Sequence, residues 1–429
     1  MSSTTPTLRR ELGKWDLTAI GVNQVIGSGV FLIPAAIAAQ VAGWSWIAVC
    51  LVALLALLIA LNFAEAGSRF EGTGGPYLYT RAAFGRFVGF EVGWMQWVTR
   101  VTSWASVLNG LASALGYYWP ALLTGAPRVG LMAFVVLAIM AINLRGIRQS
   151  AFVVNVLTIA KLAPLVIFIL VGLPYVSWGA LRPDEAVTWT QVSTSALLLI
   201  FAFGGYEVIP VPAGEARDPQ RAVPFAMITT ILIVGAVLML VQIVALGTLP
   251  GLAASKTPLA DASVLFLGAG GALLMTAGAA VSMAGNNVGA ALSGSRTMFA
   301  LAEQGDLPKA FGHVHPRFQT PDAAIVITCL VTLLLALSGS FVTMAAASAV
   351  ARLLLYGGTC AAVLALRRRG RAPFTIPFGP VVPVLALVVS AAILSGATRT
   401  QLEVGLVALV IGAVLFAMAR RGAAPAPAA

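Results

Sequence analysis

Long stretches without a single charged residue limit the fold of this chain more than any other feature. Residues 43–64 and 264–295 are two such stretches, and only 10% of the 429 residues are charged, whereas 59% are hydrophobic. A soluble domain of average composition has about 25% charged residues, so a large soluble fold is excluded. Membrane β-barrels show alternating segments of about 10 residues. These longer runs instead suit helices that cross a membrane with about 20 apolar residues.

The spacing of apolar runs and turn residues predicts an all-α polytopic membrane protein with twelve transmembrane helices. The predicted helices cover residues 15–40, 44–68, 85–118, 129–144, 151–173, 191–214, 222–247, 264–302, 322–338, 342–366, 380–397 and 402–419. We expect a single transmembrane domain over residues 15–420. A cytoplasmic segment (1–14) precedes it, and an Ala/Pro-rich tail (421–429), expected to be disordered, follows it.

The basic residues are distributed unequally between the two sides of this predicted topology. With the N-terminus in the cytoplasm, 19 of the 26 Lys and Arg residues fall on the cytoplasmic side and four on the other. The remaining three, Arg100, Lys161 and Arg352, lie within predicted spans. The positive-inside rule therefore places both termini in the cytoplasm, and a bacterial plasma or inner membrane is the expected location. The net charge of +11 then reflects topology, so no nucleic-acid partner is expected.

Two predicted spans carry helix-breaking residues near their middle. The span 15–40 contains Gly27-Ser28-Gly29, and the span 191–214 contains Gly204-Gly205, with Pro210 and Pro212 after it. Such breaks free backbone groups, which lipid tolerates only where protein or a water-filled cavity surrounds them. Interrupted helices at corresponding positions of two halves indicate the binding site of a transporter. The alternative is that the glycines only let helices pack closely.

The two kinds of backbone group at such a break suit the two charges of an α-amino acid. A helix N-terminus presents free N–H groups and the positive end of a dipole, which favour a carboxylate. Unwound carbonyls favour an ammonium group. The breaks therefore predict a zwitterionic amino acid as ligand.

Several short motifs occur in a fixed order along nearly the whole chain. They are GSGVF at 27–31, GGPYLY at 74–79, AFG at 83–85, FAFGGYE at 201–207, GE at 214–215, DPQR at 218–221, SR at 295–296 and GDLP at 305–308. With this set the chain resembles the amino acid–polyamine–organocation (APC) superfamily of transporters. The resemblance implies a LeuT-type fold, with inverted repeats over residues 15–173 and 191–366 and accessory helices over 380–420.

The resemblance also implies which residues bind the substrate. The substrate carboxylate is expected at the backbone N–H groups of Gly27, Ser28 and Gly29 and at the Ser28 hydroxyl. The ammonium group is expected at the carbonyls of Val25 or Ile26, Phe201, Ala202 and Gly204, with the Phe201 side chain as a gate. Residues at the side-chain pocket are expected to be Thr99, Arg100, Trp104 and Val107.

Four polar residues are expected to couple transport to a second ion or to hold the break in place. The resemblance implies that Lys161 fills the position of the sodium ion in sodium-coupled relatives and reaches Ser282 and Asn286. Lys161 is then either a proton carrier or a fixed positive strut. Glu207 is either a proton-responsive carboxylate or a structural hydrogen-bond acceptor.

Arg100 is open to two interpretations. It either repels cationic side chains and pairs with an acidic substrate group, or it forms an ion pair with a buried glutamate. Candidates for that partner are Glu207, Glu65 and Glu91. Arg352 has no assignment from the sequence.

The function predicted from these features is secondary active transport of amino acids by alternating access. Sodium is not required, and the mode is proton-coupled symport or amino-acid exchange. Neutral amino acids are favoured as substrates, and acidic ones come second. Further alternatives are a polyamine or organocation transporter or an amino-acid exporter of the same fold and, in a different class, a channel.

No enzyme activity, cofactor or metal is expected from the residue inventory. The three cysteines, Cys50, Cys329 and Cys360, are far apart, and His313 and His315 are the only histidines. No nucleophile–base pattern lies within the spans. The expected partners are therefore an amino acid, protons and the lipid bilayer, and the chain is either a monomer or a homodimer.

Overall fold

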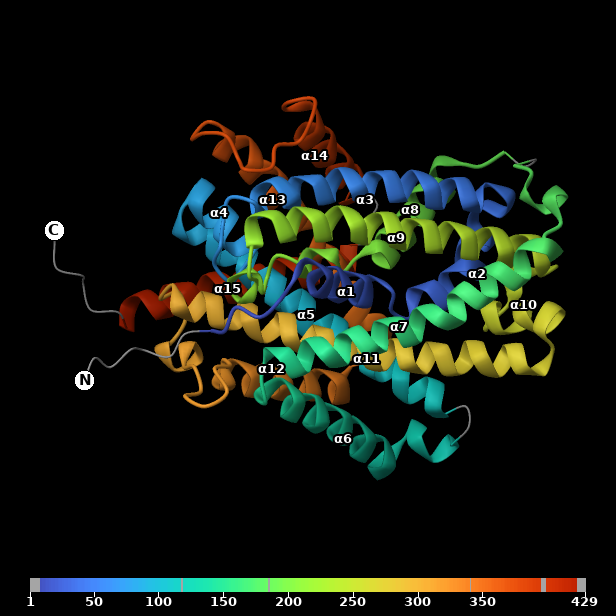
Figure 1. Ribbon diagram of the computed structural model, residues 1–429, viewed down its shortest axis with the longest axis horizontal. Coiled ribbons are helices and arrows are strands. Elements are labelled where there is room, and N and C mark those ends of the chain that lie inside the picture. Colours follow the sequence, from blue (N-terminus) through green and yellow to red (C-terminus); the bar gives the residue numbers. More distant parts are fainter. Residues whose placement is uncertain (1–7, 117–118, 184–185, 340, 395–398, 423–429) are drawn as a thin grey trace.

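The chain folds into a bundle of α-helices that run side by side along its longest axis (Figure 1). The structure is a computed structural model that describes residues 8–116, 119–183, 186–339, 341–394 and 399–422, and these residues form no β-strand. The helices are α1 (Lys14–Val25), α2 (Gly29–Val41), α3 (Ser45–Gly67), α4 (Pro76–Phe84), α5 (Arg86–Gly116), α6 (Gly125–Leu144), α7 (Ile147–Gly172), α8 (Trp189–Phe203), α9 (Pro219–Thr248), α10 (Pro258–Leu267), α11 (Ala269–Glu303), α12 (Asp322–Ser338), α13 (Phe341–Arg367), α14 (Val381–Leu394) and α15 (Arg399–Gly422).

The centre of the bundle is formed by helices that pack against several neighbours and have long buried stretches. α11 and α13 both pack against α5, and α1 packs against α7, α9 and α11. Every residue of α11 from Gly285 to Ala302 is buried. This stretch combines small residues with Asn286 and Arg296, whose side chains bond to groups inside the protein. The polar side chains of this part of α11 therefore lie inside the protein and do not face lipid.

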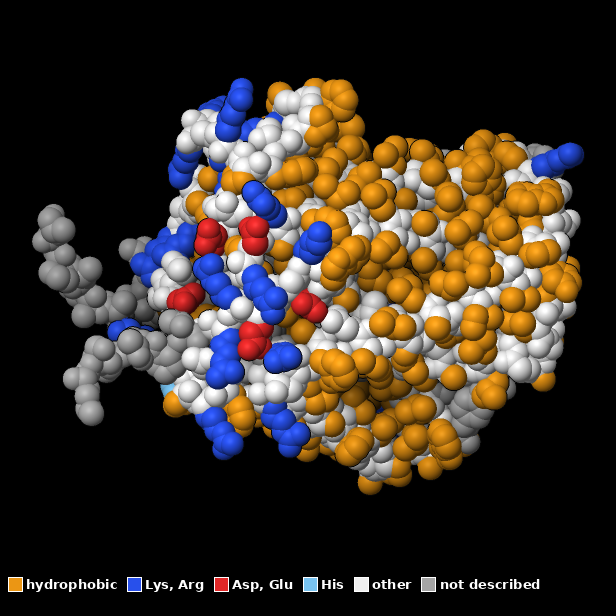
Figure 2. All heavy atoms as spheres, viewed as in Figure 1, with side chains coloured by type: hydrophobic (Ala, Val, Ile, Leu, Met, Phe, Trp, Pro, Cys, Tyr) orange, Lys and Arg blue, Asp and Glu red, His pale blue; other side chains and the backbone are white. Residues whose placement is uncertain are grey.

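The outer helices present an apolar surface. Figure 2 shows hydrophobic side chains over most of the visible face, whereas charged ones gather at the end where both chain termini lie. Among the described residues, five helical segments are long and apolar enough to cross a membrane: Gly29–Gly67, Gly125–Leu144, Arg148–Tyr175, Pro219–Thr248 and Leu402–Ala419. Large apolar side chains such as Phe134, Ile159 and Leu334 point outwards from the bundle. These features indicate an all-α multi-pass membrane protein.

The structure differs from the predicted spans at three places. The sixth span was expected over 191–214, but α8 ends at Phe203 and only short 3₁₀ turns follow (Tyr206–Val208 and Ala213–Glu215). The reason is that Gly205 takes a φ of +134° and that Pro210 and Pro212 lack the N–H of a helix. The eighth span does not start at 264, because Gly268 (φ +63°) separates α10 from α11. The third difference is the short helix α4, which was not predicted.

We call the charged end of the molecule the basic end. It carries five arginines that form ion pairs: Arg10, Arg69, Arg81, Arg86 and Arg367. These side chains pair with Glu65, Glu71 and Asp306, as Arg86 does with Asp306 (Nε–Oδ1 2.6 Å). Of the expected terminal segments, 1–14 and 421–429, residues 1–7 and 423–429 lie outside the described residues. The residues near the N-terminus that are described pair with the turn after α8, where the N–H groups of Glu11 and Leu12 donate to the Glu215 carbonyl at 2.9 Å.

A fully buried ion pair fastens this turn to α11. Arg296 donates from Nε and Nη2 to the two carboxylate oxygens of Glu215, at 2.9 and 3.1 Å, and both side chains are 0% exposed. A buried carboxylate that loses its only cation is strongly destabilising. The pair therefore holds the segment that follows the second helix break.

Replacing Arg296 by alanine is expected to cost about 3–5 kcal/mol of stability, because Glu215 would stay buried without a counter-charge. The matched control is Arg221→Ala, whose partner Asp218 is 3.9 Å away and whose side chain is 90% exposed. This control is expected to lose about 0–1 kcal/mol. Thermal unfolding of the purified variants in detergent measures both, and equal unfolding midpoints would contradict the assignment.

Candidate functional site

The first helix break leaves the start of α2 open to a cavity. α1 ends at Val25, and Ile26 leaves helical geometry at φ −77° and ψ 85°. The N–H groups of Ile26 and Gly27 still donate to Val22 and Val25, each at 2.9 Å. Among the bonds of the described residues, none is donated by the backbone N–H of Ser28 or Gly29, and the Ser28 side chain does not cap α2. The beginning of α2 thus offers free donors and the positive end of its dipole.

The second helix break lies directly against the first. α8 ends at Phe203, and the Gly204-Gly205 turn follows. A Cβ on Gly205 would lie 2.5 Å from the carbonyl oxygen of Gln24 in α1. A Cβ on Gly204 would lie 1.9 Å from Nη1 of Arg352 in α13. At Gly205 a Cβ would meet backbone, so only glycine fits there, whereas a Cβ at Gly204 would displace the Arg352 guanidinium. These two residues bring α1, α8 and α13 together.

A small cavity lies between the two breaks. Its volume is about 40 Å³, and its lining residues are Gln24, Val25, Gly27, Ser28, Gly29, Arg100, Ser103, Val107, Ala202, Gly204, Asn286 and Arg352. A water molecule needs about 10–15 Å³ of such space, so the cavity has room for a few waters and not for an amino acid. An amino acid would require lining side chains to move apart.

Most of the substrate-binding residues expected from the sequence lie at this cavity, but several do not. Ile26 is absent from the lining, because its carbonyl already accepts hydrogen bonds from Lys161 and Ser282. Thr99 is buried and donates to the Met95 carbonyl at 2.8 Å, and Trp104 is buried in the core. The side chain of Phe201, the expected gate, lies outside the described residues.

Lys161 sits at the carbonyl end of α1. Its Nζ donates to the carbonyls of Asn23 (2.9 Å), Ile26 (2.7 Å) and Ser282 (3.1 Å), and the side chain is fully buried. The ammonium group therefore meets the negative end of the helix dipole. No carboxylate of the described residues lies within ion-pair distance of it.

Two side chains of α11 complete the support of this break. The Ser282 hydroxyl donates to the carbonyls of Ile26 (2.9 Å) and Gly27 (3.1 Å). The amides of Gln24 and Asn286 bond reciprocally to each other's backbone carbonyls, at 2.8 and 2.9 Å. The carbonyls freed by the break are thus satisfied inside the protein, as a membrane requires.

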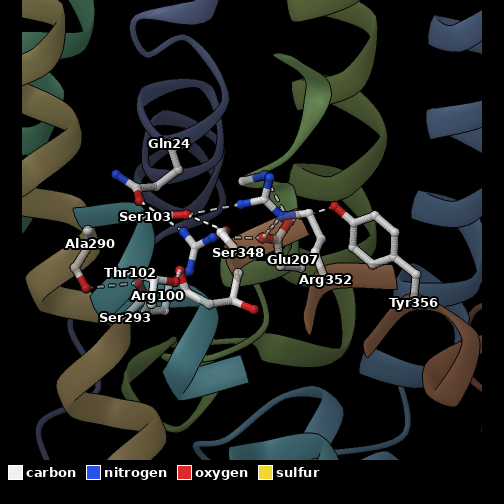
Figure 3. Close-up of polar contacts among 12 residues, drawn as sticks. Gln24, Arg100, Thr102, Ser103, Glu207, Ala290, Ser293, Ser348, Arg352 and Tyr356 are labelled. Carbon is white, nitrogen blue, oxygen red and sulfur yellow. Dashed lines mark hydrogen bonds and ion pairs between the residues drawn. The ribbon is translucent and has the colours of Figure 1, made fainter. Parts of the chain in front are cut away.

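Glu207 is the centre of a second polar cluster (Figure 3). Its Oε1 accepts from Arg100 Nη2 (2.8 Å) and Arg352 Nε (3.1 Å). Its Oε2 accepts from the Tyr356 hydroxyl (2.9 Å) and the Gly205 N–H (2.8 Å). A carboxylate has about four acceptor positions, so Glu207 has none left. Arg100 therefore forms the ion pair that was one of its two interpretations.

The balance of charge in this cluster is positive. Arg100 and Arg352 are 3% and 4% exposed and share the single carboxylate of Glu207. Arg352 also reaches Ser103 (Nη2–Oγ 3.5 Å), and Arg100 reaches Gln24 (Nη1–Oε1 3.3 Å). The sequence did not assign Arg352, because its place beside Glu207 depends on how α13 packs. Its only signal was a charge within an apolar span.

We expect Gly205→Ala to lower stability by about 1–3 kcal/mol or more, because alanine is strained at φ +134° and its Cβ would meet the α1 backbone. The control is Gly270→Ala in α11, where a Cβ meets nothing within 4 Å. Thermal unfolding in detergent compares the two. If both variants unfold at the wild-type temperature, α1 and the Gly205 turn are not in contact.

The sequence pattern of the family described as "Amino acid permease" matches residues 12–419. The chain is 29% identical to the methylthioribose transporter of Bacillus subtilis (90% of this chain, 87% of the relative) and 29% identical to the serine/threonine exchanger SteT of the same organism (89% of each). It is also 29% identical to the branched-chain amino acid permease BcaP of Bacillus subtilis (96% and 93%). The chain belongs to the amino acid permease family of membrane transporters.

Proposed function

We propose that this protein is a secondary active transporter of amino acids that works by alternating access. The observation that carries the proposal is the meeting of two helix breaks around one cavity. The free N–H groups of Ser28 and Gly29 would bind the substrate carboxylate, together with the Ser28 hydroxyl. The carbonyls of Val25, Ala202 and Gly204 would receive the ammonium group. The amino-acid relatives SteT and BcaP support the same substrate class.

We also propose the twelve-span topology, with inverted repeats over residues 15–173 and 191–366 and accessory helices over 380–420. The two breaks fall in the first span of each repeat, which supports this division. The gathering of basic side chains beside both termini supports a cytoplasmic location of that end (Figure 2). Rocking of the repeats would then expose the cavity to each side in turn.

Transport without sodium is the second part of the proposal. Lys161 already donates to carbonyls at the end of α1, where a bound cation would need them. A fixed ammonium group so placed leaves no negative site for sodium. We propose that Lys161 supports either proton symport or exchange, and that Glu207, with four donors around it, has a structural role.

Lys161→Ala is expected to reduce amino-acid uptake into proteoliposomes at least about tenfold, because it leaves buried carbonyls unpaired at about 1–3 kcal/mol each. The control is Lys256→Ala, whose side chain is exposed. Uptake is measured with and without sodium and at two pH values. Wild-type rates with unchanged pH dependence would remove Lys161 from the mechanism.

Acidic amino acids are a second candidate substrate class, and Arg352 favours it. Two buried guanidinium groups, Arg100 and Arg352, share the single carboxylate of Glu207, while Lys161 bonds only to carbonyls. A surplus guanidinium at the cavity would attract a substrate carboxylate. Neutral amino acids remain the first candidate, since the surplus charge can also serve an α-carboxylate.

Counterflow of labelled amino acids in liposomes separates these classes from each other and from a channel. Cationic substrates are expected to compete more than about tenfold less well than neutral ones, because like charges brought together cost several kcal/mol. If aspartate competes with the wild type but not with Arg352→Gln, the acidic class is supported. Competition by polyamines alone would overturn the amino-acid proposal, and the absence of saturable counterflow would favour a channel.

A further inference from the structure

A second, larger cavity lies at the basic end, far along the helices from the two breaks. It has a volume of about 510 Å³ and opens between α3, the end of α13 and the loop over residues 368–380. Its walls carry one carboxylate, Glu65, and four guanidinium groups, Arg69, Arg367, Arg368 and Arg371. None of its lining residues lines the cavity between the two helix breaks.

Only one of the four arginines is neutralised by a close pairing. Glu65 is fully buried and binds Arg367 through two bonds, Nε–Oε1 at 2.7 Å and Nη2–Oε2 at 2.5 Å. It also accepts from the Ile376 N–H at 2.9 Å, whereas Nη2 of Arg69 is 3.7 Å away. The cavity therefore holds a surplus of positive charge.

The remaining arginines keep unused donors. Arg69 donates from Nη1 to the Gly370 carbonyl at 2.9 Å, but its Nε and Nη2 are buried without a hydrogen-bond partner. The exposed side chains of Arg368 and Arg371 make no hydrogen bond or ion pair with the described residues. Buried N–H donors without an acceptor are costly. Planar guanidinium groups are suited to the several oxygens of a phosphate.

An apolar surface begins where the cavity ends. Pro380 is part of the cavity wall, and α14 starts at the next residue. Phe378, Val381 and Val388 are 80%, 60% and 60% exposed. In Figure 1 this loop and α14 stand at the edge of the bundle, and Figure 2 shows basic side chains beside hydrophobic ones there. A ligand that fits both surfaces carries a phosphate and an acyl chain.

We propose that this cavity binds the phosphate headgroup of an anionic phospholipid, with its acyl chains along α14. Basic pockets between helices at the cytoplasmic surface suit such headgroups. The lipid would join the end of α3 to the end of α13 through Arg69 and Arg368, because Arg367 is already bonded to Glu65. Because α13 also carries Arg352 and Tyr356, the bound lipid stabilises the helix that holds Glu207.

The experiment uses the full chain in nanodiscs of phosphatidylcholine with increasing phosphatidylglycerol. The retained lipid is counted by native mass spectrometry, and thermal unfolding is measured in parallel. The test variant is the double substitution Arg368→Gln, Arg371→Gln, whose exposed side chains leave the fold unchanged. The matched control is Arg217→Gln, Arg221→Gln, which removes two exposed arginines elsewhere at the same end.

Phosphatidylglycerol is expected to be retained preferentially and to raise the unfolding temperature of the wild type and the control. The loss of both cavity arginines is expected to weaken the retention of phosphatidylglycerol about thirtyfold, because it removes the binding free energy that two cations usually contribute near an anionic membrane. Equal retention of the two lipids, or an equal loss in the control, overturns the proposal. Inorganic phosphate is a separate arm, and a full stabilising effect of phosphate alone overturns the assignment to a lipid.

Discussion

The contact between Lys161 and the end of α1 is the interaction on which the candidate site depends. Backbone carbonyls cannot remain unpaired inside a membrane, so a broken helix there needs donors from its neighbours. The Lys161 ammonium and the Ser282 hydroxyl supply these donors to Ile26 and Gly27. With these carbonyls satisfied, the N–H groups at the start of α2 stay available to a ligand. The break is therefore both stable and chemically useful.

Buried ion pairs hold the segments around this site in place. Glu207 links the turn after α8 to α5 and α13, through Arg100 and Arg352. Glu215 links the end of the same segment to α11 through Arg296. The segment from Gly204 to Glu215 has almost no regular helix of its own. Its position depends on these two carboxylates, because a buried charge is stable only next to its partner.

Much of the helical layout was predictable, since apolar length and turn residues are local properties. The break at residues 27–29 was visible because two glycines flank Ser28 and a proline follows. The 3₁₀ turns after Phe203 were not predicted, since the Gly205 conformation depends on contact with Gln24. At the site, Val25, Gly29 and Ala202 were expected and line the cavity. Ile26 was expected as well, but Lys161 and Ser282 occupy its carbonyl.

The sequence by itself determined the all-helical membrane class and the residues at which two helices break, because hydropathy, glycine and proline act over a few residues. It also marked Arg100, Lys161 and Arg352 as charges that need partners inside the protein. Only the tertiary structure decided which residues are those partners. Arg352 meets Glu207, 145 positions away in the chain, and Lys161 meets Asn23, 138 positions away. Such pairings arise from the packing of separate helices, and a linear pattern contains no information on which helix faces will meet.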